Sequence, residues 1–194
     1  MSIPTYSAPG LPSHVDLDLS RNEGSRFDVD LVRLVDDPEE LIRRYPDTVA
    51  LRSRLATLHG VAAEQVLVTA GGDDALLRCV LARLGPGLTG VATTPSFQMI
   101  EVYAGQVGAR LVEVEWWDHQ FPTAEVAAAA GDADAVFLVS PNNPTGSTIT
   151  EDELRRVADA APLVVVDAAY VEFADEDPTR AALAMGNVLV VRTL

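Results

Sequence analysis

The chain has 194 residues, 48% of them hydrophobic and 22% charged, a composition that excludes a disordered or collagen-like chain. Its formal net charge of −15 excludes nucleic acid as a partner, because binding to phosphate backbones requires a basic surface. No apolar run approaches the roughly 18 residues of a membrane span, and the first residues resemble no signal peptide, so we expect a cytoplasmic protein that does not contact membranes.

The first 30 residues are rich in proline, serine and aspartate and are predicted to form an arm, while residues 31–194 are predicted to form one domain. Two helices are expected early in this domain. The first covers residues 38–44. The second has one apolar face and is closed by Gly60, and the residues of that face are Leu51, Leu55 and Leu58.

From residue 65 onward, short apolar runs alternate with amphipathic segments. The runs predicted to be strands are QVLVT (65–69), GVATT (90–94), RLVEV (110–114), AVFLV (135–139), LVVVD (163–167) and NVLVVR (187–192). The segments predicted to be helices are 73–85, 96–108, 123–131, 150–160 and 179–185. Thr150 and Glu153 match a capping box at the start of the fourth of these helices. This alternation predicts an α/β fold of three layers (αβα), with a mostly parallel sheet covered on both faces.

Ligands bind at the carboxyl ends of the strands in such sheets, so the residues that follow strands are candidates for function. The stretch AGGDDA, residues 70–75, places two glycines at a helix start, where free N–H groups can bind an anion. It is either a phosphate-binding turn or an ordinary turn between a strand and a helix. Phe97 follows the next strand and either stacks on a flat ring or belongs to the core.

The stretch VSPNNPTGS, residues 139–147, follows a fully apolar strand with residues that suit neither helix nor strand. It is either a tight corner and nothing more, or a corner whose asparagine amides face a ligand. Asp167 ends the next apolar strand, and a carboxylate there rarely stays unpaired because an unpartnered buried charge is costly. Tyr170, three residues further on, can share the same pocket.

Five segments in order resemble the fold-type I pyridoxal phosphate (PLP) aminotransferases, in particular those of the histidinol-phosphate type. They are RYPD (44–47), VLVTAGGDDAL (66–76), SPNNPTG (140–146), VVVDAAYVEF (164–173) and VLVVRTL (188–194). The resemblance extends from about residue 20 to Leu194. It implies PLP as cofactor, an amino donor and a 2-oxo acid acceptor as substrates, and a homodimer in the complete enzyme.

The resemblance also implies a role for each candidate that would contact the PLP ring. Asp167 would pair with the pyridine nitrogen and keep it protonated, so that the ring can accept electrons. Asn143 and Tyr170 would form hydrogen bonds with the 3-oxygen of the ring. Phe97 would stack on the ring, where the family usually has tyrosine.

The remaining candidates are implied to bind phosphate. Gly72 and Asp73 would offer backbone N–H groups to the phosphate of PLP. Tyr45 would reach the phosphate in a neighbouring subunit, because active sites of this family are shared across a dimer.

The chain departs from the family pattern at four places. The Asp-Glu-Ala-Tyr of the family is here Asp167-Ala168-Ala169-Tyr170, and its Asn-Glu-Asn-Pro is Asn22-Glu23-Gly24-Ser25. Phe97 replaces a tyrosine. All 14 basic residues are arginine, so the lysine to which the family attaches PLP is absent.

The resemblance therefore identifies the chain as the N-terminal part of a longer enzyme, expected to be inactive alone. It also implies a seventh, antiparallel strand between the first and the sixth. Without that strand both neighbours have unpaired edges, so the isolated chain is expected to aggregate.

Three other interpretations are open. The same fold also serves PLP-dependent decarboxylases and oxidases of amino acids. A nucleotide-binding Rossmann domain would require a glycine fingerprint after the first strand and an acidic residue about 20 positions later, which this chain lacks. The third interpretation is a non-catalytic fragment, which binds either a partner or PLP in its free aldehyde form.

Overall fold

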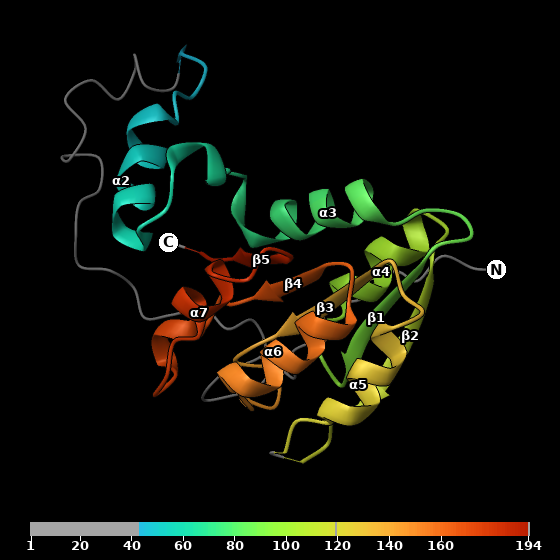
Figure 1. Ribbon diagram of the computed structural model, residues 1–194. Helices are drawn as coiled ribbons and strands as arrows, with labels where there is room; N and C mark the ends of the chain where they lie inside the picture. Colours follow the sequence, from blue (N-terminus) through green and yellow to red (C-terminus); the bar gives the residue numbers. More distant parts are fainter. Residues whose placement is uncertain (1–42, 119, 194) are drawn as a thin grey trace, which may run out of the picture. The chain divides into compact units, whose positions relative to one another are not determined.

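The structure, a computed structural model, describes residues 43–118 and 120–193 (Figure 1). Among these residues, 43–68 form one compact unit and 69–193 form another. The predicted arm, the predicted boundary after residue 30 and all but the last two residues of the helix predicted at 38–44 lie outside the described residues.

Between residues 44 and 68, the smaller unit contains one helix and one short turn of 3-10 helix. Helix α2 covers Val49–His59, and Gly60 ends it with a left-handed backbone (φ 68°), as predicted. The turn η2 follows at Ala63–Gln65. The strand predicted at 65–69 was wrong, because a strand requires a neighbour for its backbone hydrogen bonds and no described strand pairs with this segment.

The larger unit is built on a five-stranded sheet in which every pairing is parallel (Figure 1). The strand order is β2-β1-β3-β4-β5. The strands are β1 Thr89–Thr94, β2 Arg110–Glu115, β3 Ala135–Val139, β4 Val164–Asp167 and β5 Val188–Val191. The predicted parallel sheet is confirmed. Strands β3 and β4 are buried on both faces, whereas the outer strands β2 and β5 are partly exposed.

Helices cover the sheet on both faces, which confirms the three layers. Helices α3 Gly71–Arg83 and α4 Met99–Gln106 pack on one face. Helices α5 Thr123–Ala130, α6 Glu151–Ala160 and α7 Thr179–Leu183 pack on the other, and the turn η3 covers Val171–Phe173. Strand β3 contributes to both cores, since Phe137 points to the first face and Leu138 to the second.

Helix α6 begins with the predicted capping box. The Glu153 backbone N–H donates to Thr150 Oγ1 (3.3 Å), and the Thr150 backbone N–H donates to Glu153 Oε2 (2.8 Å). These bonds satisfy N–H groups that have no partner within the helix.

Thr150→Ala is expected to lower the free energy of unfolding by about 1 kcal/mol, because it removes the side-chain half of this cap. Urea denaturation at constant pH measures the change. Thr123→Ala is the matched control, since Thr123 begins α5 without a side-chain cap. Equal losses for the two variants would contradict a specific role for the capping box.

The strand order reverses direction between β1 and β3. From β1 the chain crosses over α4 to β2 on one side, and later returns through α5 to place β3 on the other side of β1. The loop after β1 therefore leads to one face of the sheet, and the loop after β3 leads to the other. Open α/β sheets bind ligands in the crevice at such a point.

The ladder between β1 and β3 is the shortest of the four described ladders. Its three residue pairs end at Ala92 and Phe137, whereas β1 and β2 share six pairs and the other two ladders share four each. Thr93 and Thr94 pair only with β2. The two strands thus separate at their carboxyl ends, below the crevice.

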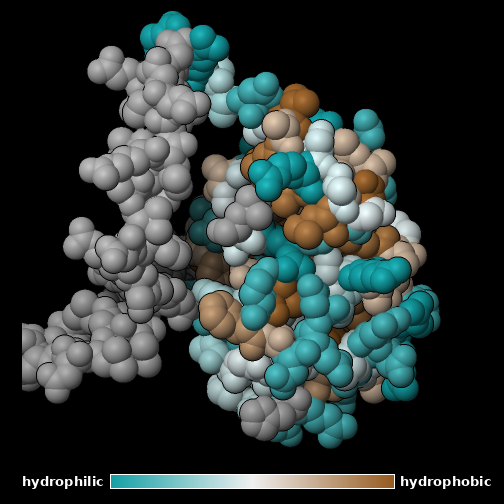
Figure 2. All heavy atoms as spheres, turned by 90° about the vertical axis from the view of Figure 1, so that its left-hand side faces the viewer, coloured by the Kyte–Doolittle hydropathy of each residue, from teal (hydrophilic) through white to brown (hydrophobic). Residues whose placement is uncertain are grey.

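Strand β5 is the outer strand on one side of the sheet among the described residues. Leu189 within it is exposed, and Figure 2 shows hydrophobic residues at the surface among hydrophilic ones on that side of the molecule. None of the helices in the described part of the chain combines the length and apolarity that crossing a membrane requires.

Candidate cofactor-binding site

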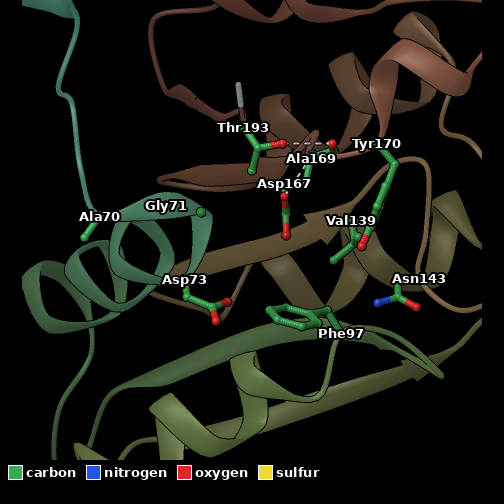
Figure 3. A pocket seen from close by; sticks show the side chains of 11 residues that line it. Ala70, Gly71, Asp73, Phe97, Val139, Asn143, Asp167, Ala169, Tyr170 and Thr193 are labelled. Carbon is green, nitrogen blue, oxygen red and sulfur yellow. Dashed lines mark hydrogen bonds between the residues drawn. The ribbon is translucent and has the colours of Figure 1, made fainter. Parts of the chain in front are cut away.

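A pocket of about 270 Å³ lies at the carboxyl ends of the strands (Figure 3). It is lined by the start of α3 and by residues that follow β1, β3, β4 and β5. Six of the seven predicted site residues line it, and these are Gly72, Asp73, Phe97, Asn143, Asp167 and Tyr170. The other residues of the lining are Ala70, Gly71, Val139, Ala169 and Thr193.

Asp167 is the buried charge of the pocket. It ends β4, only 6% of its surface is exposed, and its side chain points into the pocket (Figure 3). The Ala169 N–H donates to Asp167 Oδ1 (3.1 Å), but none of the described arginines forms an ion pair with it. Burial raises the pKa of Asp167 to about 6, and the charge of Asp73 acts in the same direction, while the Ala169 hydrogen bond opposes both. A ligand that carries a cation against this carboxyl would remove the cost of burying its charge.

The start of α3 forms the wall that can bind an anion. Gly71 has a φ of +83°, a backbone conformation that other residues rarely adopt, and the helix continues from it for 13 residues. A methyl group on Gly72 would lie 3.5 Å from Thr193 Cγ2, so the helix start closely approaches the end of β5. The N–H groups of this first turn have no partners within the helix and can donate to a phosphate.

The two aspartates of this turn have different surroundings. Asp74 accepts a hydrogen bond from the Ala70 N–H (3.0 Å) and forms an ion pair with Arg78 (2.9 Å), so the charge of Asp74 is paired within the helix. The Asp73 side chain lies at the edge of the pocket (Figure 3). The negative charge of this side chain repels a phosphate. A phosphate would therefore have to bind to the backbone N–H of Asp73, which is the contact predicted from the sequence.

Phe97 lies in the loop after β1. The helix predicted to begin at residue 96 begins at Met99, so this part of the prediction was wrong. Phe97 is half-buried against the core that α3 and α4 cover, and its ring also faces the pocket (Figure 3). The two interpretations of Phe97 are therefore compatible, since one side of the residue packs in the core and the other can cover a flat ligand.

The two asparagines of the SPNNPTG segment differ in their surroundings. Asn142 is 2% exposed, and its amide is fully used by Ser96, Pro95 and Thr145. Asn143 lines the pocket, and within residues 43–118 and 120–193 its side-chain amide has no hydrogen-bond partner. Both interpretations of the segment therefore apply. Asn142 stabilises the corner through its hydrogen bonds, and Asn143 places a polar amide on the wall of the pocket.

The turn after β4 brings Tyr170 to the pocket, next to Phe173 with ring centroids 6.5 Å apart. Thr193, just after β5, donates from Oγ1 to the Ala169 carbonyl (3.1 Å; Figure 3). The sequence analysis did not select Thr193 or Ala169, although the rule that ligands bind beyond strand ends applies equally to β5.

Arg192 holds the segment after Tyr170 against the end of β5. Its guanidinium pairs with Glu172 and with Asp177 (2.8 Å), and it donates to Thr179 Oγ1 (2.9 Å). This cluster connects the segment after β4 to the end of β5.

Tyr45 is the predicted site residue that does not line the pocket. It belongs to the smaller unit, and 98% of its side chain is exposed. Its contact with a phosphate in a neighbouring subunit stays a prediction.

The fold and the pocket together define an α/β protein suited to a flat ligand that carries a cationic ring atom and an anionic group. The sequence pattern described as "Aminotransferase class I and II" matches residues 36–194. The chain belongs to this family, and the resemblance seen in its motifs is confirmed.

Individual relatives support the same assignment. The chain is 43% identical over 166 residues to the histidinol-phosphate aminotransferase of Stenotrophomonas maltophilia, a match that covers 78% of this chain and 45% of the relative. It is 34% identical over 196 residues to the enzyme of the same name from Maricaulis maris, covering 96% and 54%. The chain thus spans about half the length of the curated relatives it matches.

Solved structures show the same fold. The histidinol-phosphate aminotransferase of Sinorhizobium meliloti, in complex with pyridoxal-5'-phosphate, superposes with a TM-score of 0.71 and 28% identity, covering 78% of this chain and 44% of that one. The L-threonine-O-3-phosphate decarboxylase of Porphyromonas gingivalis superposes with a TM-score of 0.63 and 26% identity, covering 79% and 49%.

Proposed function

We propose that this chain supplies the PLP-binding part of a cytoplasmic aminotransferase, which transfers an amino group from a donor of the histidinol-phosphate type to a 2-oxo acid. The observation that carries the proposal is Asp167, a buried carboxyl without a cationic partner among the described residues, facing a pocket with a helix start on its wall. The names of the relatives support the donor class.

The residues of the pocket fit PLP in each of its parts. Asp167 suits a protonated pyridine nitrogen, because an adjacent cation lowers the pKa of a buried carboxyl and favours its charged form. The free amide of Asn143 and the hydroxyl of Tyr170 suit the 3-oxygen. Phe97 suits the ring face, and the N–H groups of Gly72 and Asp73 suit the phosphate.

Bound PLP supplies an electron-withdrawing ring, and the chain contributes orientation and electrostatics. In the proposed complex Asp167 holds a proton on the ring nitrogen at neutral pH. Asn143 and Tyr170 fix the rotation of the ring in its plane, and Phe97 excludes water from one face. These groups are all anchored at strand ends or in loops bound to them, so their positions are set before a ligand arrives.

The binding part of the proposal is tested by titrating the full-length gene product, freed of cofactor, with pyridoxamine 5'-phosphate, which has no aldehyde and cannot react with amines. The full-length product is used because the isolated chain is expected to aggregate. We expect saturable binding at one site per chain, seen in the fluorescence of the ligand and in a rise of the melting temperature. The transfer reaction is tested on the full-length gene product with histidinol phosphate and a 2-oxo acid. No binding to this folded, cofactor-free protein would contradict the proposal.

A second candidate is a PLP-dependent decarboxylase, which the similarity to the Porphyromonas gingivalis enzyme favours. Both candidates use the same pocket, so binding does not separate them. Release of carbon dioxide without a 2-oxo acid would favour the decarboxylase, whereas amino transfer that requires the 2-oxo acid would favour the aminotransferase.

The chain is expected to hold PLP without any covalent bond to a side chain, because it contains no lysine. After treatment with PLP and borohydride, peptide mass spectrometry should find label only at the α-amino group of Met1. Acetylation of that group is the control, and it should remove the label completely. Label on any internal peptide would contradict this prediction and would indicate an unexpected nucleophile.

A further inference from the structure

We propose that Asn142 is a positioning residue of the pocket, which ties the loop after β1 to the loop after β3 and thereby sets Phe97 opposite Asn143. The inference rests on the proposed function for the identity of the ligand. It concerns a residue that does not line the pocket, so its effect on a ligand would be transmitted through the residues it holds.

Asn142 spans the two loops with its side chain. Its Nδ2 donates to the Pro95 carbonyl (2.9 Å) and to Thr145 Oγ1 (2.9 Å), while its Oδ1 accepts the Ser96 hydroxyl (2.7 Å). Pro95 and Ser96 immediately precede Phe97. The bonds to these two residues cross 47 and 46 positions of sequence, so they join loops that are far apart along the chain.

The backbone of Asn142 is fixed as well. Its N–H donates to the Ser147 carbonyl (2.8 Å), and its carbonyl accepts the Gly146 N–H (2.6 Å). Because Asn142 is buried and held in this corner, its amide is a rigid anchor for the loop that carries Phe97. Asn143 is the next residue, so the same corner fixes the position of its backbone.

The connection lies where the sheet itself supplies none. The ladder between β1 and β3 ends at Ala92 and Phe137, and the loops beyond lead to opposite faces of the sheet. Without Asn142, no other described side-chain hydrogen bond links the loop 95–98 to the loop 140–147. The separation of the two pocket walls at this point therefore depends on one amide.

The decisive experiment compares Asn142→Leu with Asn187→Leu in the full-length gene product, freed of cofactor. Leucine has the same number and branching of side-chain heavy atoms as asparagine, but it forms no hydrogen bonds. Asn187 is a matched control, because its Nδ2 also donates to two acceptors, the carbonyls of Ala158 (2.8 Å) and Ala161 (2.9 Å), but at the opposite ends of the strands. We expect Asn142→Leu to weaken the binding of pyridoxamine 5'-phosphate about tenfold, and Asn187→Leu to leave it within about twofold.

A double variant separates positioning from general destabilisation. If Asn142 acts through Phe97, Asn142→Leu should add little to the loss caused by Phe97→Ala, because coupled residues are not additive. Fully additive losses, or equal binding by the two asparagine variants, would overturn the inference. In addition, the circular dichroism of the bound ligand, per molecule bound, should fall in Asn142→Leu alone, since it reports a fixed ring orientation.

Two further measurements keep the test decisive if a variant fails to fold or the ligand fails to bind. Ser96→Ala removes one of the three bonds and should weaken binding, while Ser96→Thr retains the hydroxyl and should restore it. If the parent chain does not bind the probe, the proposed function fails. Amide hydrogen exchange of residues 96–99 then decides the inference, because it should accelerate in Asn142→Leu and not in Asn187→Leu.

Discussion

Asp167→Asn should make the chain more stable at neutral pH while it weakens cofactor binding. The folded-state pKa of Asp167 is about 6, raised by burial above its ordinary value of 3.8. Protonated Asp167 therefore favours the folded state, a contribution that is complete below about pH 4 and is lost as the pH rises through 6. This raised pKa corresponds to about 3 kcal/mol of stability lost at pH 7, which an uncharged asparagine would recover.

The measurement is the free energy of unfolding of parent and variant without ligand, at pH 4 and at pH 7. We expect nearly equal values at pH 4 and a gain for the variant at pH 7. Binding of pyridoxamine 5'-phosphate should weaken about tenfold to a hundredfold, because a charge-assisted hydrogen bond is lost. A gain of equal size at both pH values would show that burial of the charge is not its cause.

Asp177→Asn is the control with the opposite sign. Its hydrogen bonds with Thr179 and Arg192 hold the pKa of Asp177 below its ordinary value, although partial burial acts against them. This carboxylate stabilises the fold above its unfolded-state pKa, and the contribution is lost as the pH falls. The variant should therefore be less stable than the parent at pH 7, and the difference should shrink toward acid pH.

Phe137→Ala should cost about 3–5 kcal/mol of stability, because it opens a cavity in a site where no other side chain can move in easily. Phe137 is 1% exposed, lies in the central strand β3 and packs in the core beneath α3 and α4. The loss is comparable with the whole stability of a typical domain, about 5–15 kcal/mol, so much of the variant should be unfolded at 37 °C.

Phe173→Ala is the matched control, since the same side chain is 87% exposed there. It should change the free energy of unfolding by less than about 0.5 kcal/mol. Urea denaturation of both variants, read by far-ultraviolet circular dichroism, gives the comparison. Similar losses at the two positions would mean that the packing around β3 is looser than described.

The sequence was sufficient to predict the parallel sheet because its central strands β3 and β4 are apolar on both faces. AVFLV and LVVVD read as buried strands without any tertiary information, and both are strands in the structure. QVLVT reads the same way, but Leu67 within it is exposed and the segment pairs with no described strand. Pairing depends on a neighbour, which a local pattern does not reveal.

The candidate site was predictable where one residue carries the chemistry by itself. Asp167 is an example, because a carboxyl at the end of an apolar strand requires an explanation wherever it occurs. The different surroundings of Asn142 and Asn143 were not predictable. They follow from hydrogen-bond partners near position 96, which become neighbours only when β3 is placed beside β1.

The short ladder between β1 and β3 has a consequence for cooperativity. The sheet consists of two ribbons, β2-β1 and β3-β4-β5, each with longer internal ladders than the one that joins them. Pairing of β1 with β3 brings together Gly90 and Ala135, which are 45 positions apart in the sequence, after the first ribbon has formed. The loop entropy lost in this step makes it a late event in folding. We therefore expect the ribbons to behave as separate foldons, and partial unfolding from the native state to begin by parting them along the floor of the pocket.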